Sequence, residues 1–286
     1  MHRVRSFVLI ALAALACACA GDYGHGRLQG GSRVVVRGSD TLVLLLQHWA
    51  QRYATVHPSV SIDVSGGGTG TGIASLVNGT TDVASASRAM TSAERSSIEA
   101  AGAETLETKV ALDAVAIYVH ASNPIAALGI DQLKAIFQGR IRRWADVGGA
   151  DAPIVLYSRE NSSGTYLFFK EHVLGKEDFA AEVQCLPGTA SVVQAVMHDP
   201  NAIGYGGIAA GAGVRALALR GASGAVVAPS RATASDGSYP LARPLFVYRR
   251  SDASAAAGDF VAWLITDEAQ AVAETSGFYP LRQEIP

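Results

Sequence analysis

The chain has 286 residues, of which 49% are hydrophobic and 17% are charged, and its formal net charge is −2. A chain of this length can bury ample core and fits one large domain or two of modest size. A charge this close to neutral argues against a nucleic-acid-binding protein, which usually carries a strongly basic face.

The first 20 residues have the pattern of a bacterial export signal. Basic residues precede an apolar run at 7–16, which is too short to span a membrane and is followed by small residues. Cys17 and Cys19 come directly after this run, which leaves two interpretations: one of them is lipid-modified after cleavage, or the chain is simply cleaved there. We favour the lipoprotein. We therefore expect a signal peptide over 1–20 and a flexible tether over 21–31.

Cys185 is the one cysteine beyond this segment, so the body of the chain has no disulfide framework. We expect it to be a buried, small apolar residue and not a reactive thiol. His172 and His198 have no His or Cys at a metal-binding spacing, so we expect both at the surface and predict no metal site.

Beyond residue 31 the sequence alternates predicted strands and helices, which indicates an α/β fold with a mainly parallel sheet. Three strands, at 34–36, 60–64 and 82–88, each lead through a polar loop into a helix. Because such loops gather at one edge of a sheet, they are expected to meet around one anion. The alternative is three unrelated turns, in which Gly and Ser are common anyway. The candidate residues in these loops are Ser39, Thr41, Thr69, Gly70, Thr71, Ser87 and Arg88.

Two familiar site types do not fit these loops. The Gly-rich run at 66–72 lacks the Lys-Ser/Thr ending of a nucleotide-binding loop, and no acidic residue follows it at a dinucleotide-binding spacing. No Gly-x-Ser-x-Gly sequence occurs, so a hydrolase nucleophile has no obvious position.

A fourth polar loop, at 158–165, lies between a predicted strand at 154–157 and a predicted helix at 165–173. A helix N-terminus carries partial positive charge and N–H groups without partners, so it accepts an anion readily. Arg159 adds a permanent cation, and the Ser and Thr residues of the loop add hydroxyl donors. These features predict a pocket for a small oxyanion; an ordinary capped turn with a solvated Arg is the alternative.

The remaining segments continue the same alternation. Thr91 and Glu94 match a capping box that begins a helix ending at Ala100. Asp113 interrupts an apolar strand, and because a buried acid needs a partner, we place it at a strand crossing or near a cleft. The other expected elements are strands at 110–119, 201–206, 214–219 and 245–248, helices at 130–137 and 190–197, a loose connection at 221–237, and a helix at 254–274 with Phe260, Trp263, Leu264 and Ile265 inward.

Several short motifs occur in an order that resembles one family. They are Gly38-Ser39-Asp40-Thr41, the run at 66–72, Ala86-Ser87-Arg88, Leu112-Asp113-Ala-Val-Ala, Ile136-Phe-Gln-Gly139 with Trp144, Ser158-Arg159 through Thr165, Ala202-Ile-Gly-Tyr205 and Tyr239-Pro-Leu-Ala-Arg-Pro244. From about residue 32 to residue 280, the chain is similar to the phosphate-binding proteins of phosphate ABC transporters, in their shorter form. The resemblance implies a two-lobed periplasmic-binding-protein (type II) architecture with a hinge of crossing strands and phosphate in the cleft. Lobe I would be 32–112 with 241–286, and lobe II 113–240.

The resemblance also implies a set of phosphate-binding residues. Family members commonly have an acid two residues after the loop Arg, where it accepts the proton of hydrogen phosphate and rejects sulfate; this chain has Asn161 there, beside Glu160. Another acid is common in the third loop, where this chain has Arg88. As acceptors in their place we expect Asp40 or Glu160, then Asp113. The implied site is Ser39, Asp40, Thr41, Leu42 through its backbone, Thr69, Gly70, Thr71, Ser87, Arg88, Arg159, Glu160, Asn161, Ser163, Gly164 and Thr165.

The function implied by the resemblance is capture of inorganic phosphate and its delivery to the permease of an ABC importer. We expect an exported monomer, periplasmic or at the cell surface and held to the membrane only by a lipid, with no cofactor and no enzymatic activity. The alternatives are a binding protein for another oxyanion such as sulfate or molybdate, and a phosphate sensor. A remote alternative is a phosphatase, which would need a metal cluster or an activated nucleophile.

Overall fold

The computed structural model describes residues 31–221 and 224–281. One hydrogen-bonded path of its strands has the order β2-β1-β3-β11-β4-β8-β6-β7. The predicted signal peptide and nearly all of the predicted tether lie outside these residues. Within the described ranges no helix is both long and apolar enough to cross a bilayer.

The first half of this path is a parallel sheet extended by one antiparallel strand. β1 (Ser32–Gly38) lies between β2 (Val60–Ser65) and β3 (Val83–Ala86) and is parallel to both, and β11 (Ala242–Arg250) pairs antiparallel with β3. These strands alternate buried and exposed side chains or are wholly buried, as expected for a sheet covered by helices. The helices of this half are α1 (Val43–Val56), α2 (Thr69–Val77), α3 (Ser92–Ala100), α8 (Ala255–Trp263) and α9 (Asp267–Thr275).

The second half of the path joins β8 (Ala202–Gly207) to β6 (Val155–Arg159) and β7 (Gln184–Leu186), all parallel to one another. β9 (Arg215–Arg220) pairs with β4, and β5 (Ala127–Gly129) and β10 (Val226–Val227) pair with β9. The helices here are α4 (Ile130–Phe137), α5 (Gly164–His172), α6 (Gly188–His198), α7 (Arg231–Ser235) and the 3-10 turns η1 (Trp144–Val147) and η2 (Ile208–Ala210).

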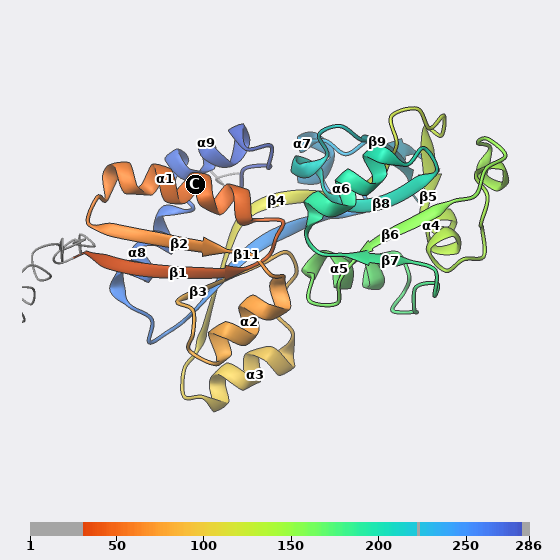
Figure 1. The fold of residues 1–286 in the computed structure, drawn as a ribbon. Coiled ribbons are helices and arrows are strands. Elements are labelled where there is room, and N and C mark those ends of the chain that lie inside the picture. The colour runs from red at the N-terminus through yellow and green to blue at the C-terminus, as the bar shows by residue number, and fades with distance from the viewer. Residues whose placement is uncertain (1–30, 222–223, 282–286) are drawn as a thin grey trace, which may run out of the picture. The chain divides into compact units, whose positions relative to one another are not determined.

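β4 (Thr105–Val119) belongs to both halves, and Figure 1 shows it running with β11 between them. Residues 105–114 of β4 pair with β11, whereas its last five residues pair with β8 and β9. Asp113 lies where this change of partner occurs, as predicted for a residue at a strand crossing. The α/β class is confirmed, whereas the proposed lobe boundaries stay a prediction.

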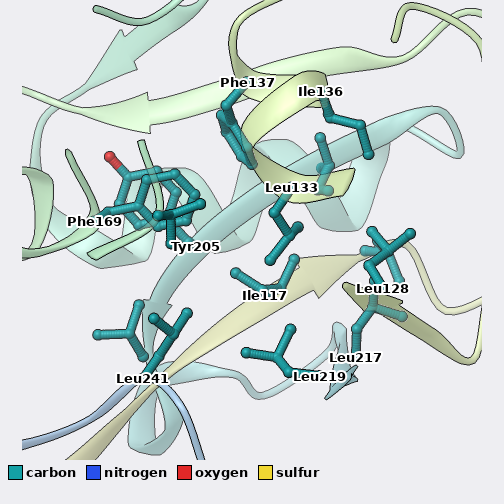
Figure 2. Packing of buried hydrophobic residues seen from close by; sticks show 14 of the residues in the cluster. Ile117, Leu128, Leu133, Ile136, Phe137, Phe169, Tyr205, Leu217, Leu219 and Leu241 are labelled. Atoms are coloured by element: carbon teal, nitrogen blue, oxygen red, sulfur yellow. The ribbon is translucent and has the colours of Figure 1, made fainter. Parts of the chain in front are cut away.

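Two large apolar clusters stabilise the two halves. In the first, Trp49, Tyr53 and Phe260 are almost completely buried. In the second, the rings of Phe169 and Tyr205 stack with centroids 3.9 Å apart (Figure 2). Because Phe169 is on α5 and Tyr205 on β8, this contact fixes α5 against the sheet, and with it the polar loop before α5.

The structure corrects three expectations about these elements. α2 begins at Thr69, four residues before the predicted start, so part of the Gly-rich run is helical. The predicted helix at 254–274 is two helices, because the Thr266 side chain accepts from the Ala269 N–H and begins α9; Ile265, at the break, is 45% exposed and does not point inward. The connection at 221–237 contains β10 and α7.

The prediction that Cys185 is buried is wrong. It lies on β7, the last strand of the path, and is exposed. We expect maleimide to label Cys185 in the folded protein at a rate close to that of a small free thiol, with the Cys185→Ser variant as the blank. Labelling of Cys185 only after addition of denaturant would contradict this assignment. His172 and His198 are both exposed, as predicted.

Candidate anion-binding site

Three helices begin at the ends of strands that face the junction of the two halves. α1 follows β1, α2 follows β2, and α5 follows β6. Neither α1 nor α2 has a side-chain cap at its N-terminus, so N–H groups of their first turns have no capping side chain as partner. Ser163 caps α5, and its oxygen accepts from the N–H groups of Thr165 and Tyr166. Its own O–H is still available as a donor.

The predicted loops converge through their side chains. Thr41 Oγ1 lies 3.1 Å from Thr165 Oγ1, and Thr69 Oγ1 lies 3.4 Å from Ser87 Oγ. Four of the five hydroxyl-bearing residues are buried, with Thr41 partly exposed. We call Thr41, Thr69, Ser87, Ser163 and Thr165 the hydroxyl cluster. It unites one residue from each of the first three loops with two from the fourth.

Two glycines allow these loops to approach so closely. A Cβ on Gly164 would lie 2.4 Å from Thr69 Oγ1 and 2.6 Å from Ser87 Oγ. Gly68 has a φ of +92° and would place a Cβ 2.6 Å from the Ser162 carbonyl oxygen. Any side chain at either position would push the halves apart, so the glycines are required by the contact between loops and not only by turn geometry.

Arg159 is the buried cation of the site, with only 1% of its side chain exposed. Its Nη2 donates to Asp40 Oδ2 at 2.7 Å, and its Nη1 donates to Thr189 Oγ1 at 2.8 Å. Asp40 is held in turn by the Gly67 N–H, which donates to Oδ1 at 2.8 Å. Arg159 Nε is buried and has no hydrogen-bond partner within the described residues, which marks it as a donor free for a ligand.

A second buried ion pair, between Arg243 and Asp113, lies beside the hydroxyl cluster. The two residues are opposite one another on β11 and β4, and Nη2 of Arg243 donates to Asp113 Oδ2 at 2.8 Å. Burial raises the pKa of Asp113, and Arg243 opposes that rise; burial lowers the pKa of Arg243. Nη2 also donates to Thr165 Oγ1 at 3.0 Å, and Nη1 donates to the Ser87 carbonyl at 2.9 Å.

The charges of this region nearly cancel, since Arg159 pairs with Asp40 and Arg243 with Asp113. An anion would therefore be held by many oriented donors and helix starts, not by a net positive charge. A pocket of about 440 Å³ opens beside the hydroxyl cluster. The residues of this region that line it are Asp40, Thr41, Gly66, Thr189 and Gly207.

Comparison with known proteins identifies the family of the chain. A model of the PBP superfamily domain matches residues 24–268. The phosphate-binding protein PstS of Pseudomonas aeruginosa is 35% identical over 267 residues, covering 87% of this chain and 83% of its own. PstS of Staphylococcus epidermidis is 31% identical over 275 residues, covering 91% and 83%. The chain belongs to the family of phosphate-binding proteins PstS.

Solved structures share the fold. A Clostridium perfringens protein, described as a candidate phosphate ABC transporter substrate-binding protein with bound phosphate, superposes with a TM-score of 0.81 at 27% identity, covering 88% of this chain and all of its own. An ABC-type phosphate transport receptor from Vibrio cholerae has a TM-score of 0.71 at 27% identity, covering 87% and 100%. The predicted periplasmic-binding-protein fold and the family resemblance are thereby confirmed.

Some residues predicted for the site of this PstS-family chain lie away from the cluster. The side chain of Arg88 donates to both oxygens of Glu94, at 2.8 and 2.6 Å, and to the Ala89 carbonyl. Thr71 and Asn161 are exposed, and Glu160 lies at the rim, 3.7 Å from Arg159. Arg88 is diverted because the α3 capping box, predicted separately, places Glu94 within its reach.

The remaining predicted positions lie in the loops around the cluster. The N–H of Leu42 donates to the Ser39 carbonyl at 3.0 Å, and the Ser39 N–H donates to the Ser85 carbonyl at 2.9 Å. The Gly70 N–H donates to the Ser162 carbonyl at 2.9 Å, which joins α2 directly to the loop before α5. These backbone bonds hold the loops in place.

Two residues of this region were not predicted, Arg243 and Thr189. Arg243 lies in the Tyr239 to Pro244 motif, and the requirement of Asp113 for a buried partner was the signal that pointed to a cation. Thr189 has no such signal, since its role depends on the start of α6 reaching Arg159.

The Arg88–Glu94 pair leads to a pH prediction. Burial raises the pKa of Glu94, but the hydrogen bonds from Arg88 and Thr91 outweigh it, so the pKa lies below its ordinary value of 4.5. The pair therefore stabilises the fold above that value, and this contribution is lost as the pH falls through the lower, folded-state pKa. We expect Glu94→Gln to be less stable than wild type by roughly 0.5 to 1 kcal/mol at neutral pH.

The check is urea unfolding of both proteins from about pH 6 to about pH 3, where the difference should shrink as Glu94 becomes protonated. Asp63→Asn, which changes an exposed acid paired with Arg33, is the control. A difference for Glu94→Gln that is constant across this range would contradict the prediction.

Proposed function

We propose that the protein is an exported solute-binding protein that captures inorganic phosphate between two lobes and presents it to the permease of an ABC importer. The observation that carries the proposal is the convergence of loops from both halves on one buried hydroxyl cluster with Arg159. Membership of the PstS family supports the same ligand. In this proposal β4 and β11 are the hinge, lobe I is 32–112 with 241–286, and lobe II is 113–240.

The proposed ligand-holding groups are those that the structure brings together. Arg159 Nε supplies a charged donor, the hydroxyl cluster supplies neutral donors, and the uncapped starts of α1 and α2 supply backbone N–H groups. Hydrogen bonds to a charged group contribute about 1.5 to 3 kcal/mol each, and micromolar binding corresponds to about 8 kcal/mol. About four such bonds therefore suffice for micromolar affinity, which a site with this many donors can supply.

Binding without catalysis is the proposed mode of action. The relatives reported above are named as binding proteins. Among the residues that the structure describes, no group of three His, Cys, Asp or Glu is placed to hold a metal ion. We further propose that the protein acts as a monomer and that Cys17 or Cys19 carries its lipid anchor.

Titration calorimetry of the wild type with phosphate, sulfate and molybdate tests the proposed ligand. We expect micromolar or tighter phosphate binding and a rise in the unfolding temperature with phosphate, since the ligand binds only the folded state. If sulfate or molybdate binds more tightly than phosphate, the proposed ligand is wrong and the protein is a binding protein for that oxyanion. Release of phosphate from a phosphate ester, absent from a heat-denatured control, would favour the phosphatase.

Selectivity against sulfate requires an acceptor for the proton of hydrogen phosphate, and we assign this role to Asp40. Its carboxylate is oriented by Arg159 and Gly67 and lines the pocket beside the cluster. Asp113 is completely buried and bonded to Arg243, so it is a weaker candidate. Glu160, at the rim of the site, is the remaining candidate for the proton acceptor.

We expect Asp40→Asn to lower the ratio of the dissociation constant for sulfate to that for phosphate by about tenfold or more. The reason is that an amide can donate to a fully ionised oxygen, whereas the carboxylate repels it. Competition calorimetry measures this ratio, and Glu160→Gln is the comparison. A change in the ratio for Glu160→Gln alone would move the acceptor to Glu160, and no change in either would remove the assignment.

A further inference from the structure

Arg243 makes more contacts to the site than an ordinary structural ion pair would need. Its side chain is 1% exposed, and four hydrogen bonds leave it: two to Asp113, one to the Ser87 carbonyl and one to Thr165 Oγ1. The Phe168 ring lies 5.3 Å from its Cζ. One guanidinium thus joins β4, the loop after β3 and the first turn of α5, which come from both halves of the sheet.

The bond to Thr165 has a definite direction. A guanidinium has five N–H donors and no acceptor, so Thr165 Oγ1 must accept from Arg243. One lone pair of that hydroxyl is then occupied, and its single hydrogen remains to be donated. Thr41 Oγ1, 3.1 Å away, can either accept this hydrogen or donate its own. In both arrangements one O–H of the Thr41–Thr165 pair is left to donate outward.

Asp113 makes this arrangement possible at an acceptable electrostatic cost. An isolated buried cation is strongly destabilising, whereas one held by a carboxylate with two hydrogen bonds is tolerated. Because Nε and Nη2 of Arg243 both donate to Asp113 Oδ2, the guanidinium plane is fixed, and the second N–H of Nη2 is directed at Thr165. The hydroxyl is also polarised by the charge behind it, which strengthens it as a donor.

We propose that Arg243, oriented by Asp113, is a positioning residue of the anion site that holds the Thr165 hydroxyl as a donor toward the bound oxyanion. The inference rests on the proposed function, because it assumes that the anion contacts the hydroxyl cluster. In this proposal a residue of the crossing strand β11 contributes to the affinity for the anion, in addition to the residues of the four loops.

The test removes both charges together, since a single substitution would leave a buried charge without a partner. The double variant Asp113→Leu/Arg243→Met replaces the pair by apolar side chains, and it is compared with wild type in phosphate calorimetry. The control is Arg33→Met/Asp63→Leu, which removes an exposed Arg–Asp pair between β1 and β2. We expect the first pair of changes to weaken phosphate binding about tenfold and the control to leave it unchanged.

A double-mutant cycle with Thr165→Val separates positioning from a general structural role. If Arg243 acts through the Thr165 hydroxyl, its removal weakens binding about tenfold when Thr165 is present and less than about twofold when it is Val. An equal loss in both backgrounds, or no loss in either, overturns the inference. If the apolar pair does not fold, Asp113→Asn/Arg243→Gln serves in the same cycle with the same expected result. Failure of wild type and control alike to bind phosphate would instead overturn the proposed function on which the inference rests.

Discussion

Replacing Arg159 by Gln is expected to weaken phosphate binding by about 100-fold or more. The change removes a buried guanidinium whose Nε has no protein partner within the described residues, and it also breaks the ion pair that orients Asp40. Charged hydrogen bonds contribute about 1.5 to 3 kcal/mol each, so the loss of two corresponds to about 100-fold or more. Arg159→Lys keeps the charge but not the planar fork, and we expect an intermediate loss.

The control for the Arg159 substitutions is Arg88→Gln. The sequence places both Arg residues in the phosphate site, whereas the structure commits Arg88 to Glu94. We expect Arg88→Gln to bind phosphate within about threefold of wild type, because both terminal nitrogens of Arg88 already donate to Glu94 and not to the hydroxyl cluster. Calorimetry on both variants checks the pair of expectations. Equal losses would restore the assignment made from sequence and place Arg88 at the ligand.

Replacing Gly164 by Ala is expected to weaken phosphate binding by about tenfold to 100-fold while leaving the unliganded protein folded. The added Cβ would meet Thr69 Oγ1 at 2.4 Å and Ser87 Oγ at 2.6 Å. Overpacking of this kind costs about 1 to 3 kcal/mol when it cannot relax. Because Thr69 and Ser87 belong to one half of the sheet and Gly164 to the other, separating the halves relieves the clash, so the cost falls on ligand binding.

The matched control for Gly164→Ala is Gly258→Ala. Gly258 lies inside α8, and a Cβ there would lie 3.9 Å from the nearest neighbouring group, the Arg249 guanidinium. We expect this control to be slightly more stable than wild type, by about 0.5 to 1 kcal/mol, with unchanged affinity. Calorimetry and thermal unfolding with and without phosphate measure both effects. Wild-type affinity in Gly164→Ala would show that the loops need not meet for binding.

The sequence predicted the local elements well because their signals are local. The capping box of α3 follows from Thr91 and Glu94 three residues apart, and the structure contains it. The loops after β1, β2 and β3 were expected to meet because strand ends of a parallel sheet share one edge, and the family resemblance added the loop after β6. The structure brings Thr41, Thr69 and Thr165 into one cluster.

Two errors arose, one from the place of a strand in the sheet and one from a helix cap that the helical period does not show. The edge position of β7 exposes Cys185, although its residue type is usually buried. Ile265 was placed inward by helical periodicity, but the cap at Thr266 breaks the helix there and changes the direction of the chain. Periodicity assumes a continuous helix, so it fails wherever a new cap begins.

The sequence by itself determined the fold class and the four polar loops, including the loop that contains Arg159, because strand, loop and helix signals extend over only a few residues. Tertiary structure alone decided which charges pair. Arg243 reaches Asp113 only through the register of β11 on β4, across 130 residues of chain, and Arg88 turns to Glu94 because a helix start lies within reach. Strand register and the spacing of packed elements have no local sequence signal, so the partners of buried charges emerge only once the chain is folded.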